Sequence, residues 1–331
     1  MADADPVADV VLAIDGLSVV LRTRGGEATI LDAVTLAVDA GETVALVGES
    51  GAGKTVLALA VMGLLPDAMV ATGGVICLAG TELLGAPDSV IRSLRGGDMA
   101  MVFQDPQSSL HPAFRVGAQV AEAIRTHQPG VGKAAASARA VELLTRVGIP
   151  QADVRARDYP HQLSGGMRQR VTIAMAMANQ PRLLIADEAT TALDVTVQAQ
   201  VLDVLRAAQS ETGAAMLVVT HDLGVVAAVA DRVVVMYAGR VVEEGSVVDV
   251  LTAPAHPYTR GLLAAVPRID DASPVQAIPG QPPSPFVRPS GCAFRTRCDR
   301  ADETCAATLP ALAVVGGAAH AVACHHPETA S

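Results

Sequence analysis

Short apolar runs recur along the chain, and each ends at polar residues. Residues 43–47 (TVALV), 183–186 (LLIA) and 216–219 (MLVV) are apolar and rich in branched side chains. Strands that are buried on both faces of a parallel sheet have this composition. We therefore predict a buried strand at each of the three runs.

Longer stretches of helical character alternate with these runs, at residues 56–65, 168–179 and 197–209. Pro66 is expected to end the first of them. Strands that alternate with helices predict an α/β core with a largely parallel sheet. Ligands of such sheets bind at the carboxyl ends of the strands, which is where the polar residues of this chain fall.

The pattern changes after about residue 250. Seven prolines lie between Pro267 and Pro289, and four of the five cysteines lie between Cys292 and Cys324. Because proline removes backbone donors and fixes φ, the first stretch is expected to be an extended connector. We predict a separate small region beyond it, so that the chain divides at residues 10–250 and 251–331.

The composition allows a large buried core and disfavours nucleic acid as a partner. Of 331 residues, 50% are hydrophobic and 18% are charged, which excludes disorder throughout. The formal net charge is −10. Because duplex binding depends on basic contacts to phosphates, no nucleic-acid partner is expected.

A mean hydropathy of +0.38 raises the question of membrane-spanning segments. Residues 306–323 contain no Asp, Glu, Lys or Arg, but Pro310 and Gly316 interrupt them. A spanning helix needs about 20 mostly apolar residues. The chain begins MADAD, which is acidic where a secretory signal is basic. We expect a cytosolic chain that is able to dock on a membrane protein.

Residues 48–55, GESGAGKT, fit the pattern G-x-x-x-x-G-K-[ST] and lie between a predicted strand and a predicted helix. Glycines let successive backbone N–H groups turn toward phosphate oxygens, beside the positive end of the helix. Lys54 is expected to reach the β- and γ-phosphates, and Thr55 to offer its hydroxyl to Mg²⁺. The predicted phosphate-binding residues are Gly48, Glu49, Ser50, Gly51, Ala52, Gly53, Lys54 and Thr55.

Two carboxylates follow the run at residues 183–186. Asp187 is placed to hold Mg²⁺ at such a phosphate site, and Glu188 to orient the attacking water or accept its proton. Many strands end in solvated carboxylates, so this pair alone does not indicate a magnesium site. It does so only together with the predicted phosphate-binding loop.

A third motif, LSGGMRQR at residues 163–170, precedes a helical stretch. Ser164, Gly165 and Gly166 predict a helix N-terminus with free N–H groups, which is a second anion site. One chain has no evident use for two anion sites per nucleotide. A head-to-tail pair of chains would use both sites, because each chain's phosphate loop would face the other chain's Ser-Gly-Gly.

These ordered motifs resemble the ATP-binding subunits of ABC transporters over about residues 10–331. Gln104 after a short apolar run, Ala-Leu-Asp at residues 192–194 and His221 after a strand add to the resemblance. It implies a P-loop NTPase of the ABC type, which is an α/β fold with a mixed sheet, a β-rich edge and a helical subdomain at about residues 105–165.

The resemblance also implies roles for individual residues. Gln104 would sense Mg²⁺ and the membrane subunit, His221 would contact the γ-phosphate, and Gln169 belongs to the family signature. The Ala-Leu-Asp loop would contact the second ATP-binding chain. The cofactors implied are ATP and Mg²⁺.

One departure concerns adenine. The family usually places an aromatic ring shortly before the phosphate-loop strand, but residues 1–54 contain no Phe, Tyr, Trp or His. Arg22 or Arg24 is a candidate to stack its guanidinium plane on the base instead. Loose holding of adenine is the alternative.

Residues 256–263, HPYTRGLL, look like the segment that follows the ATPase core in dipeptide and oligopeptide importers, and Gln281-Pro282-Pro283 continues the likeness. Importers of nickel, glutathione or opine-like compounds share this segment. Peptide import is therefore the predicted function, with these other solutes as alternatives.

The four C-terminal cysteines, Cys292, Cys298, Cys305 and Cys324, are spaced C-x5-C-x6-C-x18-C. In a cytosolic chain this favours a metal site over disulfides. Zinc knuckles usually have fewer residues between their cysteines. Subunits with this cysteine pattern resemble ones that carry a [4Fe–4S] cluster. Zinc and unliganded structural thiols remain alternatives, and His320, His325 and His326 are reserve ligands.

The resemblance implies partners and a location. A second ATP-binding subunit (homologous or identical), two membrane-spanning permease subunits and an extracellular substrate-binding protein would complete the transporter. The chain would lie peripherally at the cytoplasmic face of the inner membrane. The rival hypothesis is a soluble ABC-type ATPase acting on DNA or ribosomes, but that class favours two fused cores or a coiled-coil insertion with basic surfaces.

Overall fold

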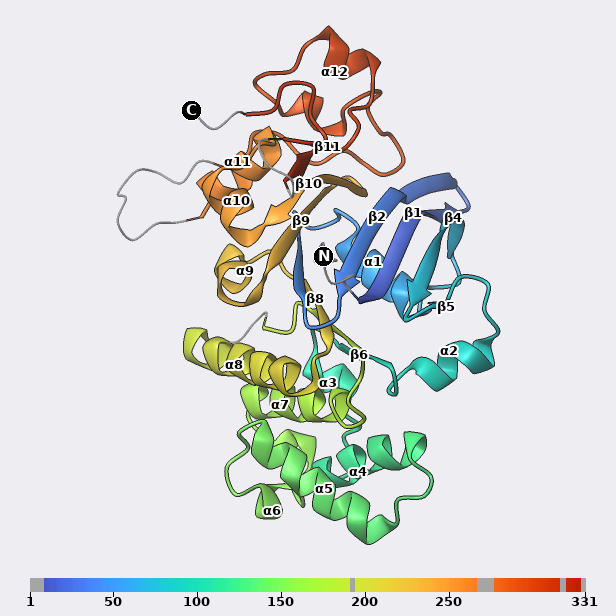
Figure 1. Cartoon of the computed structure of the whole chain (residues 1–331), viewed down its shortest axis with the longest axis vertical. Coiled ribbons are helices and arrows are strands. Elements are labelled where there is room, and N and C mark those ends of the chain that lie inside the picture. Colours follow the sequence, from blue (N-terminus) through green and yellow to red (C-terminus); the bar gives the residue numbers. More distant parts are fainter. Residues whose placement is uncertain (1–8, 191–193, 267–276, 316–319, 329–331) are drawn as a thin grey trace, which may run out of the picture. The chain divides into compact units, whose positions relative to one another are not determined.

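The computed structural model of the chain describes residues 9–190, 194–266, 277–315 and 320–328 (Figure 1). These residues form two compact units that are each discontinuous in sequence. The described residues of the first unit fall within 1–12, 38–42 and 78–218, and those of the second fall within 13–37, 43–77 and 219–331.

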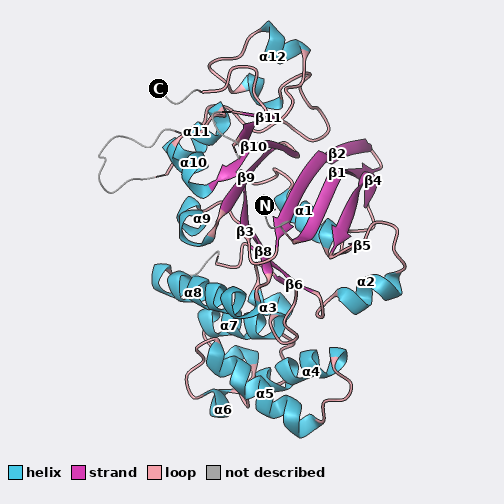
Figure 2. Cartoon of the chain, viewed as in Figure 1, coloured by secondary structure: helices cyan, strands magenta, loops and turns pink. Residues whose placement is uncertain are grey.

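The first unit combines a few short strands with most of the long helices (Figure 2). Its elements are β5 (Thr81–Glu82), α2 (Asp88–Leu94), β6 (Met99–Val102), α3 (Pro106–Ser109), α4 (Val116–His127), α5 (Lys133–Arg146), α6 (Ala152–Arg155), a 3-10 helix (Pro160–Gln162), α7 (Gly165–Ala176), β7 (Leu183–Asp187), α8 (Val195–Thr212) and β8 (Ala215–Val219).

The strands of this unit place polar residues together at one edge. β6 pairs in parallel with β7, with Met99 opposite Leu183 and Val102 opposite Ala186. Residues that follow the two strands by equal distances therefore leave the sheet side by side.

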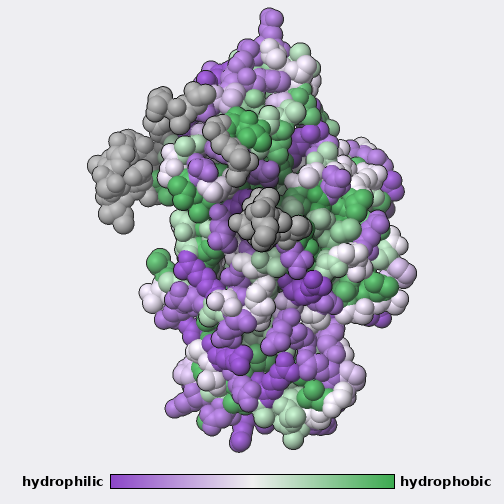
Figure 3. Space-filling model, viewed as in Figure 1, coloured by the Kyte–Doolittle hydropathy of each residue, from purple (hydrophilic) through white to green (hydrophobic). Residues whose placement is uncertain are grey.

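Helices α4 and α5 pack through apolar side chains at helical spacing. Val120 and Ile124 of α4 are fully buried, as are Ala136 and Leu144 of α5. In Figure 3 the surface over α4–α6, at the lower end of the view, is mostly hydrophilic with scattered apolar patches. The structure thus has helices α4, α5 and α6 between residues 116 and 155, while a subdomain at about residues 105–165 stays a prediction.

The second unit is richer in strands. Its elements are β1 (Val10–Thr23), β2 (Gly26–Asp39), β3 (Thr43–Val47), α1 (Lys54–Val61), β4 (Met69–Leu78), α9 (Leu223–Val229), β9 (Arg232–Tyr237), β10 (Arg240–Ser246), α10 (Val247–Thr252), α11 (Pro257–Ala264), a 3-10 helix (Ala293–Thr296), α12 (Glu303–Ala307), β11 (Ala313–Val314) and β12 (Ala321–Val322).

Strand pairing in this unit is mixed. β2, β1 and β4 are neighbours in one sheet, and the order β11-β12-β10-β9-β3 runs through the other. β3 is parallel to β9, whereas β10 is antiparallel to both β9 and β12. The prediction of a mixed sheet with a β-rich edge is thereby confirmed.

The predicted helix at residues 56–65 is shorter than expected and is ended by a glycine, not by Pro66. α1 begins at Lys54 and ends at Val61. Gly63 has φ 62°, its N–H donates to Ala60 O, and Leu64 N–H donates to Leu59 O. These two bonds form the Schellman arrangement, which closes a helix at a left-handed glycine.

The C-terminal part of the second unit has a small aromatic core. The ring centroids of Tyr237 and Tyr258 are 4.6 Å apart, and the ring of Phe294 lies 5.2 Å and 5.4 Å from them. Valines of β9 and β10 pack against the same rings. Residues after 251 are therefore joined to the sheet through shared apolar burial.

Within the described residues, every helix falls short of the length and apolar character needed to span a membrane.

Candidate nucleotide and cysteine sites

The predicted phosphate-binding loop, residues 48–55 of the second unit, needs its first and last glycines. Gly48 has φ 152° and Gly53 has φ 104°. A Cβ on Gly48 would lie 2.3 Å from Met236 O, and one on Gly53 would lie 2.7 Å from Leu31 Cδ2. A side chain at either position would displace the loop, because real Cβ atoms do not approach so closely.

Lys54 lies inside this loop. It is 6% exposed, and its Nζ donates to Gly48 O at 2.7 Å and to Glu49 O at 3.0 Å. The N-terminus of α1, which follows the loop directly, has no side-chain cap, and Thr55 in its first turn is exposed. This donor set fits a polyphosphate.

Two residues that touch the loop were not predicted from the sequence. Arg297 bonds the Glu49 carboxylate, and the Tyr258 hydroxyl accepts from Glu49 N–H. Tyr258 belongs to the importer-like HPYT segment, and Arg297 directly precedes Cys298. Their contact with the loop had no sequence signal, because pairs more than 200 positions apart follow no periodicity.

In the first unit, the structure brings Gln104 and Glu188 together. Gln104 Nε2 donates to Glu188 Oε2 over 2.8 Å. Glu188 has φ 46°, a left-handed backbone conformation that is costly for a residue with a side chain. Asp187, at the end of β7, is buried.

The LSGG motif forms the start of α7, as predicted. Ser164 is the N-cap and its Oγ accepts from Met167 N–H at 3.3 Å. Gly165 is exposed, whereas a Cβ on Gly166 would lie 2.4 Å from Val197 Cγ1 of α8. Gln169 is buried in the same helix.

Two further predicted positions lie at the starts of helices. Residues 192–193 of the Ala-Leu-Asp loop lie outside the described residues, whereas Asp194 caps α8 by accepting from Val197 N–H at 2.9 Å. His221 follows β8 and is exposed, directly before Asp222, which caps α9.

The predicted magnesium ligands belong to both units. Thr55 lies in the second unit, and Gln104 and Asp187 lie in the first. Their joint coordination of one ion stays a prediction. Arg22, a candidate for adenine, pairs with Glu27 at 3.0 Å within the β1–β2 hairpin, and Arg24 lies in its turn.

The four C-terminal cysteines line one cavity of the second unit. All are free thiols, and His325 and His326 line the same cavity. Backbone N–H groups of Arg300 and His326 donate to the sulfurs of Cys298 and Cys324, each at 3.4 Å. Such N–H···S bonds are typical of ligand sulfurs in metal and cluster sites.

Burial shapes the chemistry of these thiols. Burial raises the pKa of Cys292 and Cys298, and it raises the pKa of Cys324 to about 11. Neighbouring cysteines contribute to the rise in all three, because adjacent thiolates repel each other. The raised pKa values favour the protonated thiols. A bound cation would favour the thiolates instead, since metal coordination deprotonates a thiol.

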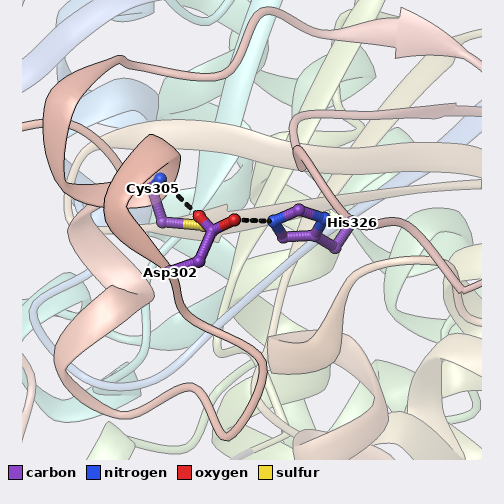
Figure 4. Close-up of side chains that lie close together, drawn as sticks. All are labelled: Asp302, Cys305 and His326. Atoms are coloured by element: carbon purple, nitrogen blue, oxygen red, sulfur yellow. Dashed lines mark hydrogen bonds and ion pairs between the residues drawn. The ribbon is translucent and has the colours of Figure 1, made fainter.

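A smaller constellation lies beside the cysteines (Figure 4). Ligand atoms of Asp302, Cys305 and His326 lie within 4.8 Å of one another. Asp302 Oδ1 accepts from Cys305 N–H at 3.0 Å, and its Oδ2 lies 2.9 Å from His326 Nε2. The Cys305 N–H, together with His326, lowers the pKa of Asp302 to about 2.

His320, expected as a reserve ligand, is engaged elsewhere. Its Nε2 lies 2.7 Å from Glu243 Oε1. The same fully buried carboxylate accepts from the N–H groups of Ala255 and His256. His320 therefore completes a buried polar network rather than the cysteine cavity.

Comparison with family models places two matches on the chain. A model described as "ABC transporter" matches residues 31–191, and one described as "Oligopeptide/dipeptide transporter, C-terminal region" matches residues 242–305.

Among curated proteins, the oligopeptide transport ATP-binding protein OppD of Mycobacterium tuberculosis is 52% identical over 96% of this chain. The chain spans about half, 52%, of the length of that relative. A putative peptide import ATP-binding protein of Brucella melitensis is 51% identical over 92% of this chain and 94% of its own length. OppD of Salmonella typhimurium is 46% identical over 90% and 89%.

Solved structures of similar fold are ATP-binding cassettes. The dimeric bacterial ABC transporter cassette MJ0796 aligns with a TM-score of 0.65 and 27% identity, over 71% of this chain and 98% of its own. CbiO1 of Clostridium perfringens, part of the transporter complex cbiONQ, aligns with a TM-score of 0.63 and 26% identity, over 74% and 92%.

Proposed function

Because this chain belongs to the ABC transporter family, among the ATP-binding proteins of oligopeptide and dipeptide transporters, we propose that it hydrolyses ATP to power peptide import. The observation that carries the proposal is the loop at residues 48–55, with buried Lys54 and the uncapped start of α1. The importer-like C-terminal segment supports peptides as the cargo.

In the proposed reaction, water attacks the γ-phosphorus of ATP, the bond from this phosphorus to the bridging oxygen breaks, and ADP and phosphate leave. Lys54 and the loop amides stabilise the charge on the phosphates. Glu188, held by Gln104, orients the water and accepts its proton, and His221 contacts the γ-phosphate. Mg²⁺, which supplies charge neutralisation between the phosphates, would be held by Thr55, Gln104 and Asp187.

We propose that two ATP-binding chains act as a head-to-tail pair. Ser164, Gly165 and Gly166 at the start of α7 would meet the nucleotide of the second chain, with Gln169 behind them. Backbone N–H groups at the start of a helix, beside its positive end, suit this role. The second chain is a homologous or identical subunit.

The remaining partners follow from import. Two membrane-spanning permease subunits would be driven by closure of the pair, and an extracellular binding protein would deliver the peptide. The helical subdomain at about residues 105–165 would receive a permease helix. The ATPase domain would comprise residues 10–250 and the extension residues 251–331, at the cytoplasmic face of the inner membrane.

We further propose that Cys292, Cys298, Cys305 and Cys324 hold a [4Fe–4S] cluster. Their shared cavity and the N–H···S bonds support four sulfur ligands in one place. Zinc is the alternative, for which Asp302 and His326 beside Cys305 are suitable donors. In either case the group would staple a short segment that has few regular elements.

Two measurements test the transport function. The tagged chain is purified in mild detergent, and co-purified polypeptides and nucleic acid are identified; membrane-spanning subunits are expected. Uptake of a labelled peptide into vesicles containing the assembled complex should require ATP and be abolished by Lys54→Ala. Co-purification of nucleic acid without membrane subunits would support a soluble ATPase instead.

A further inference from the structure

Glu49, the second residue of the phosphate-binding loop, is held by side chains from the C-terminal part of the chain. Its carboxylate accepts from Arg297 at 2.5 Å (Nη1 to Oε2) and at 2.9 Å (Nη2 to Oε1). The Arg297 side chain is 3% exposed and that of Glu49 is 27% exposed. Two parallel N–H···O bonds fix the direction of the pair as well as its distance.

Two further donors of Arg297 are also used. Nε donates to Pro279 O at 2.9 Å, and Nη1 donates to the Tyr237 hydroxyl at 3.4 Å. Its guanidinium carbon lies 5.9 Å from the centroid of the Phe294 ring. The hydrogen bond to Glu49 raises the pKa of Arg297, so it remains a cation. A buried cation held from several sides cannot swing away from the loop.

The main chain of Glu49 is held as firmly as its side chain. Its N–H donates to the hydroxyl of fully buried Tyr258 at 2.7 Å, and its carbonyl accepts from Lys54 Nζ. The peptide that leads into the anion-binding amides is thus bonded on both sides. A displacement of Arg297 or Tyr258 would therefore move the loop itself.

A second arginine, Arg288, allows a comparison. It also bonds the C-terminal region to the rest of the unit, but its hydrogen bonds are not to residues 48–55. Arg288 Nη1 donates to Asp32 Oδ2 at 2.9 Å, and its Nη2 donates to Thr29 O at 2.8 Å. If these arginines only fastened the C-terminal region, the loss of either would have the same effect on nucleotide binding.

We propose that Arg297 is a positioning residue for the phosphate-binding loop. The cysteine-containing region would thereby contribute to nucleotide binding. The inference rests on the proposed function, because ATP with Mg²⁺ is the ligand of the loop. Arg297 directly precedes Cys298, so the fold around the cysteines and the shape of the loop depend on one short segment. Losing the pair weakens ATP binding in the ground state and transition state alike, so KM rises while kcat is retained.

The test uses the full chain with Mg²⁺ and the fluorescent nucleotide mant-ATP. Arg297→Met and Glu49→Gln are each expected to raise the Kd about tenfold, which corresponds to about 1.4 kcal/mol. The double variant should bind no more weakly than the weaker single one, because both remove the same interaction. Arg297→Lys should recover part of the loss, since it restores the charge without the paired donors.

Arg288→Met is the matched control. It is expected to lower the thermal midpoint while leaving the Kd within about twofold of wild type, since its partners lie outside residues 48–55. An unchanged Kd in folded Arg297→Met, or an equal loss in Arg288→Met, overturns the inference. If Arg297→Met does not fold, Glu49→Gln decides alone, because it removes the pair from its more exposed side. A wild-type chain that binds no mant-ATP would overturn the proposed function instead.

Discussion

Gln104 donates a hydrogen bond to the carboxylate of Glu188 over 2.8 Å, although the two residues are 84 positions apart. The parallel register explains the contact. Val102 of β6 is opposite Ala186 of β7, and each of the two polar residues follows two positions later. The pair therefore arises from strand pairing, and the left-handed backbone of Glu188 turns its side chain back to the amide.

This geometry predicts that Glu188→Gln separates nucleotide binding from turnover. The substitution keeps the size of the side chain and one acceptor oxygen and removes its ability to accept a proton. We expect ATP affinity to be retained while the hydrolysis rate falls about a hundredfold or more. Nucleotide binding by mant-ATP titration and phosphate release in the assembled transporter measure the two quantities.

Gln104→Ala is the companion variant. It releases the carboxylate without changing its chemistry and removes one of the three proposed Mg²⁺ ligands, so turnover should fall by less than in Glu188→Gln. If Glu188→Gln hydrolysed ATP at the wild-type rate, Glu188 would have no role as base. A closed pair of chains should also accumulate with ATP in Glu188→Gln, which size-exclusion chromatography detects.

A second prediction uses the adjacent glycines of the LSGG motif, which have different surroundings. A Cβ at Gly166 would collide with Val197 Cγ1 at 2.4 Å, whereas a Cβ at Gly165 meets nothing within 4 Å. Gly166→Ala should therefore push α7 from α8 and lower the free energy of unfolding by about 1–3 kcal/mol. Thermal melting measures the loss.

Gly165→Ala is the control for stability and the test for function. The open surroundings predict an unchanged thermal midpoint. The added methyl group would stand at the exposed start of α7, where we place the second chain's nucleotide, so ATP turnover of the pair should fall. A stable Gly165→Ala chain with full turnover argues against that placement.

The strands and loops that carry the candidate site are predictable from sequence because they obey local rules. The run at residues 43–47 is β3 without adjustment, and the runs at 183–186 and 216–219 lie within β7 and β8. Buried parallel strands have a distinctive composition, and the loop at residues 48–55 has fixed glycine positions.

Other features escape prediction because they depend on tertiary contacts or on subtle chain ends. Proline is a conspicuous helix terminator, but α1 is ended earlier by Gly63, whose left-handed conformation only the backbone bonds reveal. The hold of Arg297 on Glu49 spans 248 positions and leaves no periodic trace. Three of the seven Phe and Tyr residues, Tyr237, Tyr258 and Phe294, are likewise gathered into one core, which composition alone does not indicate.

A third prediction concerns the metal content of the cysteine cavity. Chain purified without oxygen should contain about four iron atoms and absorb in the iron–sulfide charge-transfer region. Cys298→Ser should lose most of this iron, because Cys298 is one of the four cysteines that line the cavity. Elemental analysis and the absorption spectrum provide the measurements.

Cys77→Ser is the matched control, since Cys77 lies in β4 and does not line the cavity. It should keep the full iron content. One zinc per chain without iron would identify the alternative ion, and chains free of both metals would leave the cysteines as structural thiols.

The fourth prediction follows from His256, which caps α11 inside the aromatic core. Its Nδ1 accepts from Tyr258 N–H at 3.0 Å, and the residue is 1% exposed. Burial lowers the pKa of His256 from 6.5 to about 4, against a smaller opposing effect of the Ala323 backbone. Below pH 6.5 the His256 imidazole therefore binds a proton in the unfolded chain, whereas in the folded chain it stays neutral down to about pH 4.

The contribution of neutral His256 to stability is complete above pH 6.5 and is lost as the pH falls toward 4, by about 3 kcal/mol in all. His256→Asn supplies an oxygen as the capping acceptor of α11 in place of Nδ1 but does not titrate. Its unfolding free energy should consequently depend less steeply on pH between 6.5 and 4. Tyrosine fluorescence is a suitable probe, because Tyr237 and Tyr258 lie in this core. Parallel pH profiles of the two chains would show that His256 titrates normally when folded.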